Sequence, residues 1–209
     1  MRILPRINDD VNQEWISDKA RHMYEGLKRQ RLSFPMARKP DGSFAELKWD
    51  EALVAARKAF DKVKGSEIAA LIGPHADGES IVALRDLLHR VGCENIQTAS
   101  NVPKVNVNLR SEYTFNSRIN GLDHADFILL VGTNLRSEAP ILNSRIFHNV
   151  DHYGTEVAII GFASDNNYVY DHIGTGPQAI EDILSGDHPI REKLAKSEYP
   201  MIIVSGNAL

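Results

Sequence analysis

Hydrophobic positions follow two alternating patterns along the chain from residue 46 onward. Apolar side chains first recur at intervals of three and four, which predicts an amphipathic helix that ends near Gly65. They are Trp49, Leu53, Ala56, Phe60 and Val63. A short apolar run at 67–73 follows and is closed by Gly-Pro, as is typical of a strand that is buried on both faces. The first feature that the pattern predicts is therefore a helix followed by a buried strand.

The same two patterns repeat toward the C-terminus. Further predicted helices cover 81–91, 137–148, 177–185 and 190–195. Further predicted strands cover 95–98, 126–132, 156–161 and 200–205, whereas 99–120 has no clear pattern. Alternation of strands and helices predicts an α/β fold with a mostly parallel, doubly wound sheet that has helices on both faces.

The ends of the chain differ from its middle. Residues 1–45 are polar and contain prolines at positions 5, 35 and 40, so we expect an irregular lead-in segment with a hairpin or turn at 39–42. Residues 46–209 are expected to form the α/β domain. Because a parallel strand normally feeds a crossover helix, we expect this domain to continue past Leu209. The N-terminus has no signal-peptide or transit-peptide pattern, and we interpret it as a chain that opens within a domain.

The charge balance argues against a general affinity for anionic surfaces. There are 24 Lys and Arg against 28 Asp and Glu, which gives a net charge of -4. No global positive field is therefore available for nucleic acid or an anionic membrane. The longest apolar runs, at 127–131 and 201–204, are far shorter than the roughly 20 residues of a membrane span. The basic stretch Lys28–Arg31 lacks interleaved aromatic residues, so we predict a solvated face or a contact with an acidic partner.

The cysteine content limits the redox chemistry that the chain can support. Cys93 is the single cysteine in 209 residues. An intrachain disulfide needs two thiols and an all-thiolate iron-sulfur cluster needs four, so neither can form within this chain. One thiol also suits a reducing compartment. The sequence motifs of hydrolases, phosphoryl-transfer enzymes and zinc proteases do not occur in the sequence.

The most informative local feature is the strand-to-helix junction at 131–140, Val-Gly-Thr-Asn-Leu-Arg-Ser-Glu-Ala-Pro. A buried strand ends at Gly132, a small polar loop follows, and a helix then begins, which is an arrangement that offers free N–H groups to a phosphate. The full Gly-x-Gly-x-x-Gly motif is missing, so a tight turn at Gly132 and Asn134 is the favoured interpretation. A second junction at 160–165 lacks an acidic residue at the strand tip for a ribose hydroxyl.

Two histidines and two tryptophans have competing interpretations. His148 and His152 have the spacing of two metal ligands on a helix, but no suitable third ligand is identifiable. We also expect the helix to end between them, so the sequence favours two surface residues near a helix C-terminus. Trp15 and Trp49 lie on apolar faces of predicted helices, and we predict that both pack in the core.

Several stretches of the chain match a known protein family. Near the N-terminus they are 2–6 (Arg-Ile-Leu-Pro-Arg), 11–21 (Val-Asn-Gln-Glu-Trp-Ile-Ser-Asp-Lys-Ala-Arg) and 24–32 (Tyr-Glu-Gly-Leu-Lys-Arg-Gln-Arg-Leu). Further along they are Val131-Gly132-Thr133-Asn134, Glu138-Ala139-Pro140, Asn143, Arg145-Ile146 and 170–174 (Tyr-Asp-His-Ile-Gly). Over essentially its whole length the chain resembles the large iron-sulfur subunits (75 kDa) of respiratory complex I, NADH:ubiquinone oxidoreductase.

The resemblance implies a domain organisation and a set of departures from it. Residues 1–45 would be the end of a degenerate iron-sulfur subdomain, and 46–209 an incomplete domain similar to molybdopterin oxidoreductases such as formate dehydrogenase. Relatives with an additional cluster have a cysteine where this chain has Ser17, and a hydroxyl is a poor iron ligand, so we expect no cluster and no other metal here. Lys19 matches a lysine that lies between cluster and pterin in active relatives, and we expect it to serve an ion pair or hydrogen bond.

The resemblance also bears on the pterin pocket. In active relatives the strand equivalent to 156–160 precedes an Asp-Pro-Arg-like turn that helps to hold the pterin nucleotide, whereas this chain has Gly161-Phe162-Ala163. We therefore expect Gly132, Thr133 and Asn134 to be vestigial pocket positions, with no catalytic residue and no bound cofactor in this chain. The family's parent subunit carries 2Fe-2S and 4Fe-4S clusters.

The resemblance implies a structural and docking role, supporting electron transfer from NADH to quinone without a redox centre in this chain. It implies other peripheral-arm subunits as partners, without nucleic acid or membrane insertion. It also implies the matrix side of the mitochondrial inner membrane, which Ser17 favours, or the cytoplasmic side of a bacterial one. Two alternatives stay open: a cofactor-binding module of a molybdopterin-dependent oxidoreductase, and a non-catalytic nucleotide-binding domain.

Overall fold

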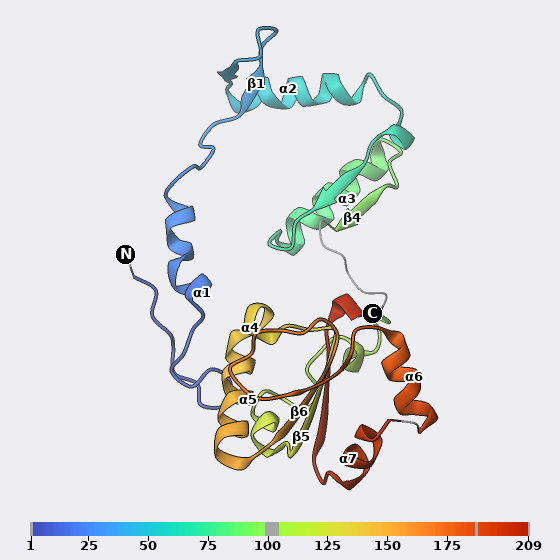
Figure 1. The fold of residues 1–209 in the computed structure, drawn as a ribbon. Helices are drawn as coiled ribbons and strands as arrows, with labels where there is room; N and C mark the ends of the chain where they lie inside the picture. Colours follow the sequence, from blue (N-terminus) through green and yellow to red (C-terminus); the bar gives the residue numbers. More distant parts are fainter. Residues whose placement is uncertain (1, 99–104, 187, 209) are drawn as a thin grey trace. The chain divides into compact units, whose positions relative to one another are not determined.

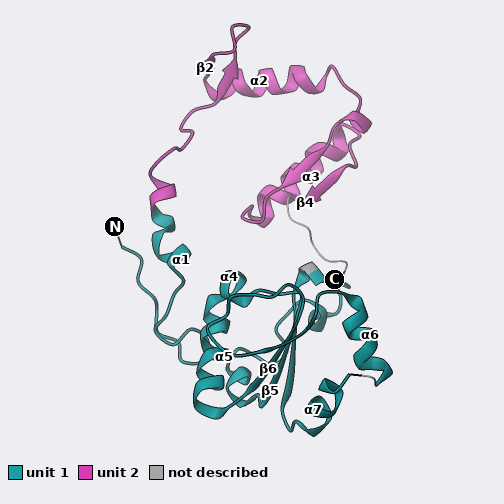
Figure 2. Ribbon diagram, viewed as in Figure 1, with its two compact units in different colours: residues 1–24, 103–209 teal, residues 25–102 magenta. Residues whose placement is uncertain are grey.

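A computed structural model describes residues 2–98, 105–186 and 188–208, and Figure 1 shows its elements. The chain divides into two compact units, which Figure 2 distinguishes by colour. Unit 1 comprises residues 1–24 and 103–209, and unit 2 comprises residues 25–102. A segment at the N-terminus and the C-terminal half of the chain thus belong to one unit.

Unit 1 is built around a four-stranded parallel sheet with the strand order β7-β6-β5-β8. Its elements in chain order are α1 (Asp18–His22), η3 (Arg110–Glu112), η4 (Asn120–His124), β5 (Phe127–Val131), α4 (Leu135–Glu138), α5 (Pro140–Tyr153), β6 (Glu156–Ile160), β7 (Asp171–Gly174), α6 (Pro177–Ser185), α7 (Ile190–Lys196), β8 (Pro200–Val204) and η5 (Gly206–Ala208). The short helix η1 (Met23–Leu27) spans the boundary with unit 2. This architecture confirms the predicted α/β class with a mostly parallel sheet.

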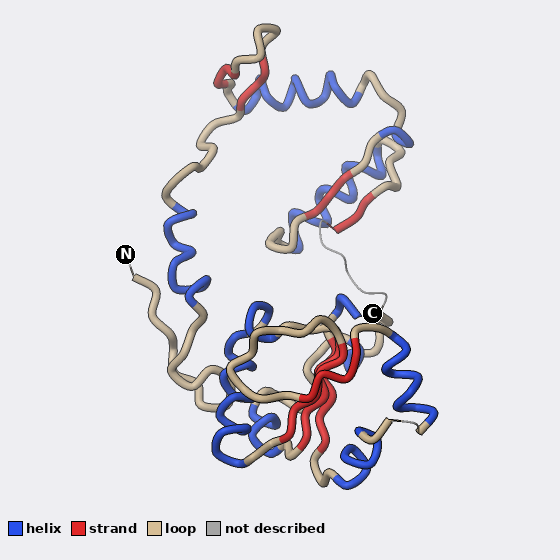
Figure 3. Tube along the Cα trace, viewed as in Figure 1, coloured by secondary structure: helices blue, strands red, loops and turns tan. Residues whose placement is uncertain are grey.

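Both faces of the sheet in unit 1 are covered, because successive side chains of a strand point to opposite faces. Ile128 and Leu130 of β5 pack in one cluster with Ile146 of α5. Phe127 and Leu129 of the same strand pack in a second cluster with residues of α6 and α7. Figure 3 shows the strands between these two sets of helices. A strand buried on both faces must be apolar at every position, which explains the unbroken run Phe-Ile-Leu-Leu-Val.

The order of the strands makes the sheet doubly wound. The chain passes from β5 to β6 to β7 in one direction and then crosses to β8 on the opposite side of β5. Helix α5 makes the first crossover, and α6 with α7 makes the return. The carboxyl ends of β5 and β6 therefore lie at the same edge, beside the point where the winding direction changes, which is where open α/β sheets usually bind ligands.

Unit 2 contains two small sheets and two longer helices. Its elements are β1 (Met36–Arg38), β2 (Phe44–Glu46), α2 (Trp49–Phe60), η2 (Gly65–Glu67), β3 (Ala70–Ile72), α3 (Gly78–Arg90) and β4 (Ile96–Thr98). Strands β1 and β2 form an antiparallel hairpin around the predicted turn, and β3 pairs with β4 in parallel. Ile68, Leu88 and Cys93 form the buried cluster of this unit, with α3 against the β3-β4 pair.

The structure corrects the predicted helix at 137–148. The described chain instead has α4 and α5, separated at Ala139, whose backbone lies outside the helical region (φ -145°, ψ 70°). Pro140 causes the break because the residue before a proline is kept out of the helical region. The second helix then continues to Tyr153 and ends at Gly154, whose φ of 71° lies in the left-handed region. Both His148 and His152 are thus inside one helix, contrary to the prediction.

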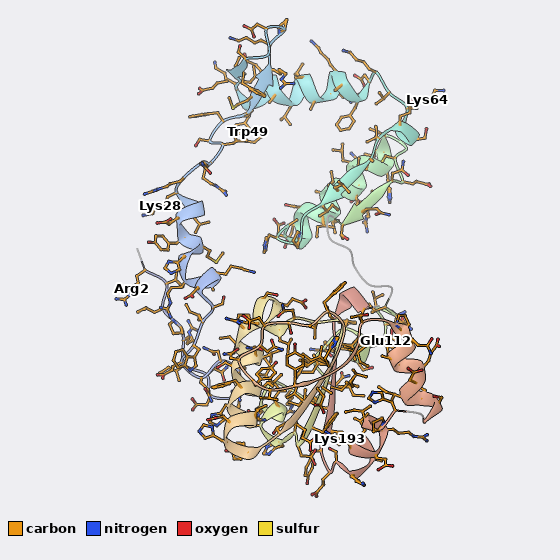
Figure 4. The ribbon with its side chains drawn as sticks, viewed as in Figure 1. Arg2, Lys28, Trp49, Lys64, Glu112 and Lys193 are labelled. Atoms are coloured by element: carbon orange, nitrogen blue, oxygen red, sulfur yellow. The ribbon has the colours of Figure 1, made fainter. Side chains whose placement is uncertain are left out.

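Two further predictions differ from the structure. Trp15 precedes α1 and is 55% exposed. Trp49, which is labelled in Figure 4, begins α2 and is 71% exposed, so neither tryptophan packs in the core. Strand β7 is absent from the predicted elements, because Asp-His-Ile-Gly is a short, mostly polar edge strand without an apolar run.

Among the described residues the longest helix is α5, with 14 residues, and none of the described helices combines the length and apolarity of a bilayer span.

Candidate functional site

A cavity of about 670 Å³ lies at the carboxyl ends of β5 and β6 and contains the predicted junction. Its lining residues come from the loops after these two strands, the start of α6 and the end of η5. They are Val131, Gly132, Thr133, Asn134, Glu138, Ile160, Gly161, Phe162, Ala163, Ser164, Thr175, Gly176, Pro177, Ile180 and Ala208. The structure thus brings Gly132, Thr133 and Asn134 together with Gly161, Phe162 and Ala163, as their positions at strand ends predict.

Gly132 is required by the backbone at this edge. Its φ is +63°, and its N–H donates to the carbonyl of Ile160 at 2.8 Å. A Cβ atom on Gly132 would lie 2.5 Å from the Cβ of Ala208. The residue is therefore glycine for a turn and a close approach of the chain, which is the structural interpretation that the sequence favoured.

Glu138 accepts hydrogen bonds from the donor groups of the junction. The sequence pattern does not reveal this role. Its carboxylate accepts hydrogen bonds from the hydroxyl of Thr133 at 2.9 Å, the N–H of Asn134 at 3.2 Å and the hydroxyl of Ser205 at 3.3 Å. These are donor groups of the kind that a bound phosphate would use. The carboxylate therefore fills the anion-binding positions of the loop with a charge from the chain itself.

The residues at this cavity do not fit an anionic pterin nucleotide. None of the described residues that line it is Lys, Arg or His, whereas Glu138 adds a negative charge. Arg136, on the neighbouring turn, pairs with the carboxylate of Asp165 at 2.8 Å. The side-chain oxygens of Asn134 and Ser164 are buried without a hydrogen-bond partner, but they are neutral groups and supply no countercharge. Repulsion from one carboxylate without a compensating cation disfavours a diphosphate.

The residues also do not fit an iron-sulfur cluster. The hydroxyl of Ser17 caps α1 by accepting the N–H of Ala20 at 3.2 Å, so it has a structural role of its own. The one thiol, Cys93, is fully buried in unit 2 and donates to the carbonyl of Ile68 at 3.1 Å. Among residues 2–98, 105–186 and 188–208 there is no group of three or more potential metal ligands. Lys19 is exposed and lines a separate cavity of about 520 Å³.

Arg145 joins the N-terminal segment to the sheet, and it is not among the residues predicted from the sequence. Its side chain on α5 is 4% exposed. The guanidinium donates to the carbonyls of Asp9 and Val11, the latter at 3.1 Å, and to the carboxylate of Asp123 at 2.6 Å. An arginine on the buried side of an otherwise amphipathic helix was the available signal, because a buried charge must be paired.

His148 and His152 lie one turn apart near the end of α5. Their rings are stacked with centroids 4.1 Å apart and an interplanar angle of 26°. Both side chains are exposed. The basic stretch Lys28–Arg31 is exposed as well, in unit 2. The structure thus places the two histidines together on a surface and keeps the basic stretch accessible.

Comparison with known proteins identifies the family. A family profile described as molybdopterin oxidoreductase matches residues 31–209, and one described as the NADH-ubiquinone oxidoreductase NDSU1/NuoG-like 4Fe-4S domain matches residues 1–25. The first match covers most of the chain. The second covers the segment that Arg145 holds through the Asp9 and Val11 carbonyls.

Individual relatives agree with these matches. The chain is 44% identical over 204 residues to the mitochondrial NADH dehydrogenase (ubiquinone) iron-sulfur protein 1 of Solanum tuberosum. It is 42% identical over 210 residues to the mitochondrial NADH-ubiquinone oxidoreductase 78 kDa subunit of Neurospora crassa, and 40% over 204 residues to a subunit of the NADH-quinone oxidoreductase of Rickettsia felis. Each comparison covers 98% of this chain but only 28%, 28% and 30% of the respective relative. The resemblance seen in the sequence is thus confirmed: the chain belongs to the molybdopterin oxidoreductase family and is a homologue of the complex I 75 kDa/NuoG iron-sulfur subunit, of which it covers the molybdopterin-oxidoreductase-like region.

Proposed function

We propose that this chain is a structural and docking portion of the large iron-sulfur subunit of NADH:ubiquinone oxidoreductase. In this role it supports electron transfer from NADH to quinone and carries no redox centre of its own. The observation that carries the proposal is the anchor at Arg145. A guanidinium buried in the sheet unit binds the backbone of the segment that matches the family's 4Fe-4S domain.

The anchor is suited to holding a neighbouring domain in place. Backbone carbonyls accept from Arg145 whatever the side chains of Asp9 and Val11 are, so the contact fixes the path of the chain. Asp123, on η4 of the same unit, supplies the countercharge that makes burial of the guanidinium tolerable. Electron transfer between clusters depends on their positions, and a rigid mount for a cluster-bearing domain is the contribution that these residues can make.

Three observations support the proposal that this chain carries no redox centre. The single thiol is buried and bonded to a carbonyl, and Ser17 caps a helix. The carboxylate of Glu138 occupies the donors that a pyrophosphate would need. The chain's own groups therefore satisfy the positions at which a cluster or a pterin nucleotide would be held.

The proposed partners are other peripheral-arm subunits, with the basic stretch Lys28–Arg31 as a contact surface. Its side chains are exposed, and exposed apolar residues flank it: Leu27 at 59% and Leu32 at 85%. Lys28 is labelled in Figure 4. Exposed cations beside apolar groups are suited to an acidic partner with an apolar centre. By similarity to mitochondrial relatives we propose the matrix side of the inner membrane as the location, or the cytoplasmic side in a bacterium.

The test is substitution of Arg145 in the full-length subunit within an assembling complex. Arg145→Ala removes three hydrogen-bond donors from two carbonyls and a carboxylate, so about 2 kcal/mol of anchoring is lost. We expect less assembled peripheral arm and an unchanged NADH:quinone rate per assembled complex. Blue-native gels and activity normalised to flavin content measure the two quantities. Normal assembly with a lower rate per complex would assign the residue a part in electron transfer and overturn the proposal.

A matched control separates the anchor from a general loss of positive charge. Arg136→Ala removes an arginine that is 53% exposed and paired with an accessible carboxylate, so assembly is expected to stay close to normal. Limited proteolysis of the chain gives an independent readout. Arg145→Ala is expected to speed cleavage within residues 2–17, whereas Arg136→Ala is not.

The second candidate function is a ligand-binding module at the cavity, and two observations favour it. The cavity lies at the strand ends beside the change of winding direction, and its volume of about 670 Å³ is within the range of small-molecule sites. Metal analysis and the absorbance spectrum of the purified chain distinguish the alternatives. Bound molybdenum, tungsten or pterin would establish a cofactor module. Saturable NAD(P)H binding that Gly132→Asp abolishes would establish a nucleotide-binding domain, and a flat titration would exclude one.

A further inference from the structure

The end of α5 carries a cluster of side chains that the proposed function does not use. His148 and His152 project from the same side of the helix, because residues four apart lie one turn above each other. Both are exposed, and their rings are stacked with centroids 4.1 Å apart. The sequence provided two arguments against a metal site here: no third protein ligand was identifiable, and the helix was expected to end between the two histidines. The structure removes the second argument, because α5 continues to Tyr153. It leaves the first, because the described residues contain no group of three potential ligands.

We propose that His148 and His152 form a chelating site for a divalent transition-metal ion of the zinc, copper and nickel class. Two ring nitrogens that bind one such ion lie about 3 Å apart, because metal–nitrogen bonds are about 2.0–2.1 Å long. The 4.1 Å between ring centroids shows that both side chains reach the same place beside the helix. Rotation of the rings out of the stacked arrangement turns one nitrogen lone pair of each ring toward a shared ion. Imidazole is a preferred ligand of these ions, whereas magnesium and calcium prefer oxygen ligands.

The surroundings of His152 favour a bound cation. The carboxylate of Asp151 lies 3.3 Å from its Nδ1 atom. This carboxylate places a negative charge beside the ring, which favours a cation at that position. The last turn of a helix also has a partial negative charge. A negative group and the helix end therefore both attract a positive ion to the place where the two rings meet.

The other side of the pair leaves room for further ligands. The His148 ring meets the edge of the Tyr153 ring, with centroids 5.9 Å apart, and no hydrogen bond of its side chain to another described residue is seen. A cavity of about 290 Å³ adjoins it and is also lined by Gln13 and by the ion pair of Arg145 and Asp123. Two protein ligands leave coordination positions that water can fill. The site is thus an exposed two-histidine chelate completed by water, and it is independent of the cavity at the strand ends.

Titration of the untagged 209-residue chain with Zn²⁺, and with Cu²⁺ followed by electron paramagnetic resonance, tests the proposal. We expect one ion per chain in the tight phase and nitrogen coupling from two imidazoles in the Cu²⁺ spectrum. Because the second ring binds at the high effective concentration set by the helix, His148→Ala or His152→Ala should each weaken binding about tenfold or more. Both positions are exposed and alanine is the best helix former, so the variants are expected to fold.

Two control variants make the test specific. His89→Ala removes an exposed histidine from the last turn of α3, where position 85, one turn earlier, is an arginine, and it should leave the affinity unchanged. The double variant Phe147→His with His148→Ala keeps the number of histidines but places them five residues apart, on different sides of the helix, and it should bind no better than His148→Ala.

The outcomes decide the proposal in either direction. Loss of tight binding in both single variants, with His89→Ala unaffected, supports it. Unchanged affinity in either single variant, or full affinity in the relocated double variant, overturns it. The unsubstituted chain gives a further check: Zn²⁺ should protect His148 and His152 from diethyl pyrocarbonate more than the other histidines, and equal modification of all sites would also overturn the proposal.

Discussion

The two units of the chain differ in how they bury apolar residues. In unit 1 both faces of the sheet carry a buried cluster, and β5 has its four residues from Phe127 to Leu130 at 5% exposure or less. In unit 2 the buried cluster of described residues consists of Ile68, Leu88 and Cys93. The middle residue of its strand β3, Leu71, is 74% exposed.

This difference teaches that the burial of a parallel strand depends on how many of its faces are covered by helices. In unit 1 the crossovers α5, α6 and α7 supply the cover. In unit 2 α3 covers one face of the β3-β4 pair, and large apolar side chains such as Trp49 and Leu53 are exposed on α2. We therefore expect unit 1 to have most of the intrinsic stability, because burial of each large apolar side chain stabilises by about 1.5–3 kcal/mol.

The largest expected effect is a difference in folding stability between alanine substitutions in a strand of unit 1 and in a strand of unit 2. Ile128→Ala in β5 removes a fully buried side chain and should cost about 3 kcal/mol, whereas Leu71→Ala in β3 should change stability by less than about 0.5 kcal/mol. Urea unfolding followed by tryptophan fluorescence measures both. Trp15 reports on unit 1 and Trp49 on unit 2, so variants that keep one tryptophan follow each unit. A cost at Leu71 equal to that at Ile128 would contradict the comparison.

A smaller contrast is expected at two glycines with positive φ. Gly132 of unit 1 has φ +63° and would place a Cβ 2.5 Å from the Cβ of Ala208, whereas Gly92 of unit 2 has φ +75° and open space around it. Gly92→Ala should cost about 1 kcal/mol from backbone strain alone. Gly132→Ala should cost about 2 kcal/mol, because a steric overlap is added to the strain. Unfolding midpoints measure the pair. Equal costs would show that the chain at Ala208 moves aside freely.

Tyr168 gives a probe of unit 1 at high pH, because all six tyrosines lie outside unit 2. Burial raises the pKa of Tyr168 to about 12. Since the unfolded chain ionises near pH 10 and the folded chain does not, stability should fall as the pH rises from about 10 to about 12. Ultraviolet titration should show a tyrosine that ionises near pH 12, and Tyr168→Phe should remove this transition. The same variant loses the hydrogen bond to Asn143, at 3.0 Å, which costs about 1 kcal/mol.

The smallest expected effect is a shared sensitivity to acid. Hydrogen bonds from Ser197 and two backbone N–H groups lower the pKa of Asp126 in unit 1, and bonds from Ser80 lower the pKa of Asp77 in unit 2. Both carboxylates are bonded in the ionised form, so their contribution is present above the ordinary value of 3.8 and is lost as the pH falls below it. Acid titration of Asp126→Asn and Asp77→Asn should show a smaller loss of folding stability as the pH falls. A loss of stability equal to that of the unsubstituted chain would contradict the prediction.

Much of the fold could be predicted because its signals are local. The helix predicted at 177–185 is α6 to the residue, since Pro177 starts it and Gly186 ends it in a left-handed conformation. The unbroken apolar run of β5 correctly predicted a strand buried on both faces. The same prediction for 67–73 was wrong, because Leu71 of β3 is 74% exposed. The break before Pro140 was also readable, because a proline keeps the preceding residue out of the helical region. The prediction instead placed Pro140 near the start of one helix at 137–148, where its missing N–H is harmless. The short edge strand β7 has no comparable signal, because its polar residues need no cover.

The candidate site was predicted in position but not in its chemistry. Gly132, Thr133 and Asn134 lie at the cavity, as their place after a strand indicated. The role of Arg145 depends on Asp9 and Val11, which lie far from it along the chain. Glu138 bonds to Thr133 and Asn134 nearby and to Ser205 far along the chain, and no residue pattern indicates which donors its carboxylate will meet. The prediction that Trp15 and Trp49 pack in the core was wrong for a related reason. An apolar stripe shows which side of a segment is apolar, but it does not show whether another element packs against that side.

The sequence by itself determined the alternation of strands and helices, the parallel sheet and the lack of thiolates for a cluster, because periodicity, proline and glycine positions and residue counts are properties of the chain alone. Only the tertiary structure decided that Ser205 joins the hydrogen bonds of Glu138 at the strand ends and that Arg145 holds the N-terminal segment. Hydrogen bonds and close approaches depend on distances in space, and residues that are more than a hundred positions apart come together only when the sheet has formed.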